Sequence, residues 1–222
     1  MASSADARAA VLGRIRKAIG GASSADVARA EWEAIPREFK RAASHERGEV
    51  LELLVERLID YDAHVVVVRP EGVTDAVKSL LEARGVRQLL VPVGMPDGVL
   101  PEGFAFVVDA GFGASELDAF DGVVTMATVA IAETGTVVLQ NAAGQGRRAA
   151  TLVPDYHLCV VQATNVVETV PEAMVRLQAT ASLATTFVSG PSATADIEMT
   201  RIKGVHGPRF LDVVVIEDAG SK

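Results

Sequence analysis

Short, unbroken apolar runs alternate with helix-like segments along most of this chain, and this alternation constrains its fold more than any other feature. The runs are rich in valine and cover residues 63–68, 88–91, 105–108, 123–131, 136–139, 157–161, 187–188 and 211–216. Apolar runs without polar alternation are typical of strands that are buried on both faces. Strands that alternate with helices, here at 73–84 and 170–183, form parallel βαβ units. The sequence therefore predicts an α/β fold, in which one mostly parallel sheet of about seven to nine strands carries helices on both faces.

The first 44 residues follow a different pattern, which predicts an N-terminal helical arm and a connector. Apolar residues recur at helical spacing from Val11 to Ile19, basic residues lie mainly on the other side, and the Gly20-Gly21 pair ends the helix. An arm of this kind either binds a partner or lies on its own domain. We expect residues 45–222 to form the α/β domain.

Composition argues against several classes of function. The formal net charge of −8 and the pI near 5.0 disfavour binding to nucleic acids or anionic membranes, since both need a basic surface. The single cysteine, Cys159, allows no disulfide within the chain and no cysteine-based iron–sulfur or zinc site. We expect it to be a small buried apolar residue. Neither a signal-peptide core nor a run of ~18 to 20 apolar residues is present, which predicts a cytoplasmic protein.

The polar segment 189–209 is the first candidate for a functional site. Glycine and proline interrupt it too often for a long helix or strand, so we expect an ordered, turn-rich loop. Long polar loops in compact domains are often functional. His206 is a candidate catalytic residue, and the candidate binding residues here are Ser192, Thr194, Asp196, Glu198, Lys203 and Arg209. The alternative is a surface loop in which these groups only cap turns and helices.

A second polar cluster, Glu133-Thr134-Gly135, interrupts two apolar runs. A charge in such a position is costly unless it is paired or used, and ligand sites in open α/β sheets gather at the carboxyl ends of strands. Glu133 is therefore a candidate catalytic residue, and Thr134 and Gly135 are candidate binding residues. The alternative is a hairpin turn with Glu133 in solvent.

Two further features bear on chemistry. The segment 141–148 contains Gly144 and Gly146, whose backbone N–H groups would suit an anion beside Arg147 or Arg148; it is no dinucleotide fingerprint, because the third glycine is missing. His157 opens a strand and is either a general base or a buried, hydrogen-bonded histidine. We keep it as a candidate catalytic residue. The four histidines lie far apart in the sequence, and no metal site is predicted.

Four motifs follow one another in the second half of the chain: AETGTVVL at 132–139, LVPDYH at 152–157, GPSATADIE at 190–198 and KGVHGP at 203–208. Their combination resembles the lactate-utilisation protein C family, the LUD domain. The chain departs from the family's pattern at 125–128, TMAT, where members often carry Gly or Asp. The resemblance implies an α/β fold similar to the group of ribose-5-phosphate isomerase, glucosamine-phosphate deaminase and the CoA-transferases. It also implies a role in oxidising L-lactate to pyruvate together with iron–sulfur partner proteins, whose clusters this single-cysteine chain cannot hold itself.

Three functional hypotheses follow. The first is a cluster-free subunit of a lactate-oxidising complex with a site for a small carboxylate or another anion. The second is a free-standing isomerase or transferase for a phosphorylated or CoA-linked substrate, in which Glu133 would be the analogue of a CoA-transferase nucleophile. The third is an assembly or regulatory module without chemistry. A homo-oligomer is compatible with each of them.

Overall fold

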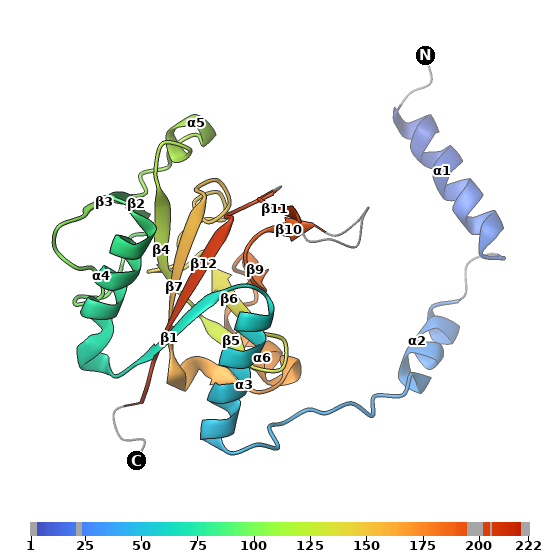
Figure 1. Cartoon of the computed structure of the whole chain (residues 1–222). Helices are drawn as coiled ribbons and strands as arrows, with labels where there is room; N and C mark the ends of the chain where they lie inside the picture. The colour runs from blue at the N-terminus through green and yellow to red at the C-terminus, as the bar shows by residue number, and fades with distance from the viewer. Residues whose placement is uncertain (1–3, 21–23, 195–201, 205, 219–222) are drawn as a thin grey trace. The chain divides into compact units, whose positions relative to one another are not determined.

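The computed structural model describes residues 4–20, 24–194, 202–204 and 206–218 (Figure 1). The chain divides into two compact units, Met1–Phe39 and Lys40–Lys222. The first unit contains helices α1 (Ser4–Ala18) and α2 (Ala25–Ala34). Ser24 caps α2, because its hydroxyl accepts a hydrogen bond from the Val27 N–H at 3.2 Å. In the part of the chain that is described, no helix combines the length and apolar character that crossing a membrane requires.

A six-stranded parallel sheet is the centre of the second unit (Figure 1). Its strands, in spatial order, are β1 (His64–Val68), β12 (Phe210–Ile216), β7 (Tyr156–Gln162), β4 (Gly122–Met126), β2 (Gln88–Val91) and β3 (Ala105–Val108). Every pair of neighbours is parallel. The central strands β7 and β12 are buried along almost their whole length, as their unbroken apolar runs predict. The expected α/β fold with a mostly parallel sheet is confirmed.

The expectation of a single sheet is wrong, because a second, four-stranded sheet is present. It contains β8 (Val166–Val167), β5 (Val129–Ile131), β6 (Thr136–Gln140) and β9 (Thr185–Val188) in that spatial order. The apolar stretch 123–131 therefore breaks after β4 and continues as β5 in the other sheet. Residues 187–188 likewise belong to β9 and do not close the parallel sheet. Strands β4 and β5 are both buried, so hydrophobicity alone cannot tell that the run 123–131 is divided between two sheets.

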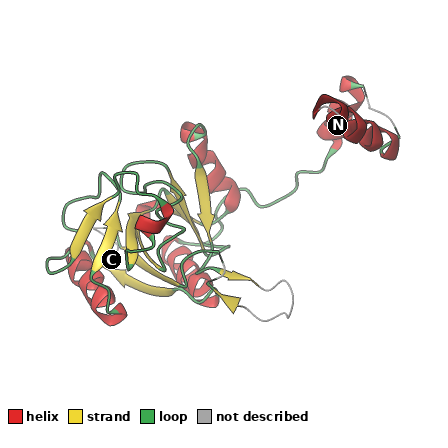
Figure 2. Cartoon of the chain, turned by 90° about the horizontal axis from the view of Figure 1, so that it is seen from above, coloured by secondary structure: helices red, strands yellow, loops and turns green. Residues whose placement is uncertain are grey.

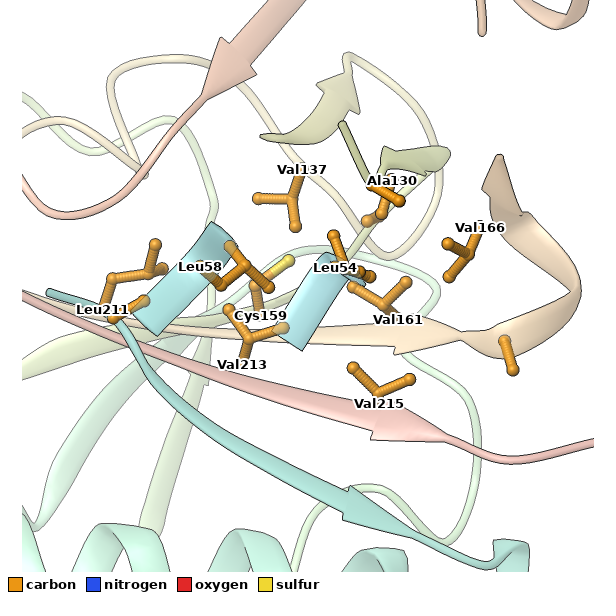
Figure 3. Packing of buried hydrophobic residues seen from close by; sticks show 14 of the residues in the cluster. Leu54, Leu58, Ala130, Val137, Cys159, Val161, Val166, Leu211, Val213 and Val215 are labelled. Atoms are coloured by element: carbon orange, nitrogen blue, oxygen red, sulfur yellow. The ribbon is translucent and has the colours of Figure 1, made fainter. Parts of the chain in front are cut away.

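Helices and the second sheet cover both faces of the parallel sheet (Figure 2). On one face, α3 (Arg47–Asp60) packs together with β5 and β6 against β7 and β12. Figure 3 shows this core, in which Leu54 and Leu58 of α3 meet Val137, Cys159 and Val213. Cys159 is fully buried, which confirms its expected role as a small apolar residue. On the other face lies α4 (Val73–Arg84), and α6 (Val170–Leu177) packs on the second sheet.

Short elements complete the second unit. The helical turns are η1 (Pro70–Gly72), α5 (Ala114–Leu117), η2 (Ala163–Asn165) and η3 (Gln178–Thr180). The polar segment 189–209 contains a small antiparallel pair, β10 (Ala193–Thr194) with β11 (Ile202–Lys203). The segment therefore contains a short pair of strands and is not only a turn-rich loop.

Candidate functional site

The candidate site is a pocket of about 280 Å³ beside the amino ends of β7 and β12. Three parts of the chain form its walls: the loop before β7, the start of β7 and β12, and the segments on either side of the β10–β11 hairpin. The polar residues of the lining are Arg148, Thr151, His157, Ser192 and His206. Phe187, Val188, Pro191, Pro208 and Leu211 form its apolar walls. Because the strands are parallel, their first residues meet at one edge of the sheet and bring these distant segments together.

His157 lies on β7, and its side chain is almost completely buried, with 1% exposed. Its Nε2 lies 2.8 Å from Oγ1 of Thr125, a buried residue of the neighbouring strand β4. Burial, and next the nearby Arg148 guanidinium, lower the pKa of His157 to about 4. The imidazole is therefore neutral at pH 7. Among the described residues none forms a hydrogen bond with its Nδ1, and His157 lines the pocket.

Arg148 stands on the same side of the pocket, in the loop that precedes β7. Its Nη1 donates to the carbonyl oxygen of Thr151 at 3.3 Å and to the Thr151 hydroxyl at 3.2 Å. The Thr151 hydroxyl donates in turn to the carbonyl oxygen of Arg148 at 3.2 Å. Burial lowers the pKa of Arg148, because a guanidinium loses hydration there. Thr151 thus holds the guanidinium end of a partly desolvated cationic side chain.

The part of the wall around Ser192 and His206 is backbone that is held by its own hydrogen bonds. Ser192 N–H donates to the Pro208 carbonyl oxygen at 2.8 Å, and Gly204 N–H donates to the Ser192 carbonyl oxygen at 2.9 Å. The Ser192 hydroxyl accepts from the His206 N–H at 3.2 Å, which leaves the hydroxyl proton for another acceptor. The His206 side chain is exposed. These contacts explain why residues far apart in the polar segment meet at one pocket.

Arg209 does not line this pocket, because it is paired with Asp155. Its Nε lies 2.7 and 2.8 Å from the two carboxylate oxygens of Asp155, and its Nη2 contacts one of them as well. The Arg209 guanidinium lowers the pKa of Asp155. This ion pair joins the loop before β7 to the start of β12, so it supports the pocket from outside.

A second polar cluster surrounds Glu168, which follows β8 and has 1% of its surface exposed. Its carboxylate accepts from the backbone N–H groups of Ser44 and His45 at 2.7 and 3.0 Å. It also contacts Nδ1 of His45 at 2.7 Å and the ammonium group of Lys40. Burial opposes ionisation of Glu168, but Lys40 and the N–H donors outweigh it and hold its pKa well below the usual range. The cluster fastens residues 40–45 to the α/β unit.

Glu133 belongs to this second cluster. It lies in the turn between the antiparallel strands β5 and β6, and its carboxylate is 2.8 Å from Nζ of Lys40. Lys40 therefore bridges Glu133 and Glu168, which raises the pKa of Lys40. Thr134 follows in the turn, and its hydroxyl lies 2.8 Å from that of Thr136, which is 2.7 Å from the Ser189 hydroxyl. Gly135 has a φ of 54° and packs against the backbone of Arg57 in α3.

The structure brings together three of the residues that the sequence singles out, namely His157, Ser192 and His206. It places Glu133, Thr134 and Gly135 in the hairpin turn and Arg209 in an ion pair. Thr194 and Lys203 belong to the paired strands β10 and β11, where Lys203 is in register with Ala193. Asp196 and Glu198 lie outside the described residues. No group of three or more His, Cys, Asp or Glu side chains is arranged to hold a metal ion within the described ranges.

Sequence reasoning did not select Thr151, Lys40 or Glu168 as site residues, and it named Arg148 only as an alternative to Arg147 beside a possible anion. Arg148 is half of the Arg147-Arg148 pair, and only the structure shows that Arg147 is bound to Asp109, with Nε 2.7 Å from Oδ2. Glu168 does carry a recognisable signal, since it interrupts the apolar run VVETV just as Glu133 interrupts its own run.

Comparisons with known proteins agree with the motifs. The sequence model of the LUD domain matches residues 1–216. The chain belongs to the LUD domain family. A LUD relative from Deinococcus radiodurans, named Lactate utilization protein C, is 37% identical over 217 residues, which cover 96% of this chain and 97% of the relative. A protein of the same name from Anoxybacillus flavithermus is 26% identical, with 94% and 99% of the two chains covered.

The fold of this LUD domain also has a solved counterpart. The crystal structure of a DUF162 family protein from Deinococcus radiodurans matches with a TM-score of 0.68 and 36% sequence identity. The match covers 78% of this chain and 99% of that one. The α/β architecture described above is therefore shared with an experimentally determined structure.

Proposed function

We propose that this LUD domain protein is a subunit required for the utilisation of L-lactate, acting in its oxidation to pyruvate together with iron–sulfur partner proteins. The observation that carries the proposal is the similarity, along nearly the full length of both chains, to the Deinococcus radiodurans protein named Lactate utilization protein C. Near-complete coverage matters because it includes the candidate pocket as well as the fold.

The chemistry of the chain is consistent with such a division of labour. Oxidation of L-lactate to pyruvate releases two electrons and two protons, so an electron acceptor must take part. Protein iron–sulfur clusters are held mainly by several cysteine thiolates, and the one cysteine of this chain is buried in the core. Burial raises the pKa of Cys159 to about 12, which keeps it as an uncharged thiol. In the proposed complex the electrons therefore pass to the partner proteins.

The test is lactate-dependent dye reduction by the iron–sulfur partner proteins, with and without this chain at matched concentrations. We expect dye reduction to require the chain, and pyruvate to accumulate in proportion to the dye reduced. Full activity of the partners alone would overturn the proposal. Activity that needs the chain but survives both His157→Gln and His206→Asn would keep the subunit in the complex and assign it an assembly role.

The free-standing transferase hypothesis receives less support from the geometry. Its nucleophile would be Glu133, but this carboxylate is paired with Lys40 in a hairpin turn and does not line the pocket. A pocket of about 280 Å³ lies just below the range of roughly 300 to 1,000 Å³ for small-molecule sites, so it would enclose only part of a CoA-linked substrate. Thermal-shift measurements with CoA esters and sugar phosphates test this alternative, since a ligand that binds the native state must raise its apparent stability.

A further inference from the structure

Arg148 differs from three other arginines that lie close to the parallel sheet. Arg84, Arg147 and Arg209 each bind a carboxylate, those of Asp212, Asp109 and Asp155 respectively. Arg148 has no carboxylate partner among the described residues, and only its Nη1 donates hydrogen bonds there. Its Nε and Nη2 groups thus remain as donors at the pocket wall. A guanidinium presents these donors as a fork that suits the two oxygens of a carboxylate.

The surroundings of Arg148 also favour an anion. Burial removes part of its hydration, and a partly buried charge without a counter-ion is costly. His157, which also lines the pocket, is neutral at pH 7 and so contributes no charge of its own. Since no described residue supplies a counter-ion, a bound anion would do so. The pocket therefore suits a negatively charged ligand better than a neutral or cationic one.

The remaining groups indicate which anion fits. Phosphate groups are commonly bound by several free backbone N–H groups, but here the N–H groups of Ser192, Gly204 and His206 already have acceptors. The available polar groups are instead Nδ1 of His157 and the hydroxyl proton of Ser192, which suit a single hydroxyl or keto oxygen. Val188 and Leu211 offer apolar surface for a short alkyl group. This combination matches a small acid with one oxygen next to its carboxylate.

We propose that the pocket at the amino ends of β7 and β12 binds a small 2-hydroxy or 2-oxo carboxylate, with Arg148 as the anchor of its carboxylate group. His157 Nδ1 and the Ser192 hydroxyl contact the neighbouring oxygen, and Thr151 is a positioning residue that holds Arg148. The choice of this acid class rests on the proposed function, whereas the anion site rests on the pocket itself. Neither Arg148 nor Thr151 belongs to the motifs by which the family resemblance is recognised.

The test is direct binding to the full-length protein, by calorimetry and by the NMR signals of the imidazole nitrogens. The probes are L-lactate, pyruvate, propionate, which lacks the second oxygen, and inorganic phosphate. We expect saturable binding of lactate or pyruvate, weaker binding of propionate, and a shift of the His157 signals on binding. Arg148→Gln should weaken binding by about ten-fold or more, as expected for loss of a charged hydrogen-bonding partner.

Two variants serve as controls. Arg148→Lys keeps the charge but lacks the fork and should retain part of the affinity. Arg69→Gln removes one positive charge from a side chain that is 77% exposed, and it should bind like the wild type. The proposal is overturned if no small carboxylate binds saturably, if phosphate binds and carboxylates do not, or if Arg148→Gln binds as tightly as Arg69→Gln.

Together with the dye-reduction test, these results distinguish failure of the proposed binding site from failure of the proposed function. Failure to bind, together with dye reduction that still requires the chain, would reject the site and leave the function standing. Binding that depends on Arg148, together with full dye reduction by the partners alone, would keep the site and reject the role in lactate oxidation.

Discussion

His157 shows how one buried side chain shapes both the stability and the chemistry of the pocket. An ordinary histidine has a pKa near 6.5, so it takes up a proton readily in the unfolded chain. In the native state its pKa is about 4, because burial and the nearby Arg148 disfavour the charged imidazole. Between these two values the unfolded state binds more protons than the native state. Stability must therefore fall as the pH falls through this window.

We accordingly predict that the free energy of unfolding drops by about 2 kcal/mol between pH 7 and pH 5 because of His157. The contribution is complete above about pH 6.5 and is lost progressively toward about pH 4. Urea denaturation at a series of pH values checks this, since His157→Gln should remove this pH dependence. His64→Gln, which replaces an exposed histidine, should keep it. An unchanged slope in His157→Gln would contradict the prediction.

Gly135 makes the hairpin turn possible at a place where α3 comes very close. A Cβ atom there would lie 2.7 Å from the carbonyl carbon of Arg57 and 2.8 Å from its oxygen, and the φ of 54° already disfavours other residues. Gly85 has a similar φ of 67°, but nothing lies within 4 Å of the added atom.

We predict that Gly135→Ala lowers the free energy of unfolding by about 3 kcal/mol, against about 1 kcal/mol for Gly85→Ala. Both variants adopt the same unfavourable backbone conformation, so the difference between them reports the contact with α3. Paired urea titrations measure it. Equal losses in the two variants would show that α3 can move away at little cost.

At the scale of elements, the sequence predicts the individual strands better than the sheets to which they belong. The apolar runs locate the strands of the parallel sheet, and β7 and β12 are as buried as their composition indicates. The pattern cannot show that β4 and β5 belong to different sheets, because residues on both sides of the break are buried. Hydrophobic periodicity predicts that a residue is buried, but it does not predict which strand or helix buries it.

The same limit applies to the candidate site. The polar segment 189–209 and His157 are visible in the sequence, and Ser192, His206 and His157 do line one pocket. Glu133 carries an equally clear signal, yet its partner is Lys40, which is 93 residues away in the sequence. The sequence does not distinguish Arg147 from Arg148, but the structure pairs Arg147 with Asp109 and gives Arg148 no carboxylate partner among the described residues. The sequence thus shows which residues could take part in binding, but it does not show which of them meet in one pocket.

Helix α3 packs against both sheets. The burial of its apolar face should therefore contribute much of the free energy that holds the two sheets together. Leu54 is fully buried in the core that α3 forms with β6, β7 and β12 (Figure 3). We predict that Leu54→Ala lowers the free energy of unfolding by about 3 kcal/mol, through lost burial and an unfilled cavity. Ile59→Ala, on the exposed face of the same helix, should cost only about 0.5 kcal/mol. Thermal and urea unfolding of both variants measures the contrast, and similar losses would contradict the assigned packing.

At the scale of the whole molecule, the α/β unit needs a short segment that precedes its first helix. Within the described residues, the four hydrophobic clusters consist of residues from Val50 onward, and no described residue before Lys40 belongs to them. Residues 40–45 are different, since Lys40, Ser44 and His45 supply the partners of the buried Glu168 carboxylate. Removing these partners leaves a buried charge that is strongly destabilising.

We therefore predict that a chain starting at Lys40 keeps the unfolding midpoint of the full-length α/β unit, whereas a chain starting at Glu46 has a clearly lower one. Glu168→Gln provides the decisive comparison. In the chain starting at Lys40 it removes a paired carboxylate and should lower stability, but in the chain starting at Glu46 it removes an unpaired one and should raise stability. Urea denaturation of the four proteins gives the coupling between Glu168 and residues 40–45. A change of the same sign and size in both chains would mean that the segment does not hold the Glu168 charge in place.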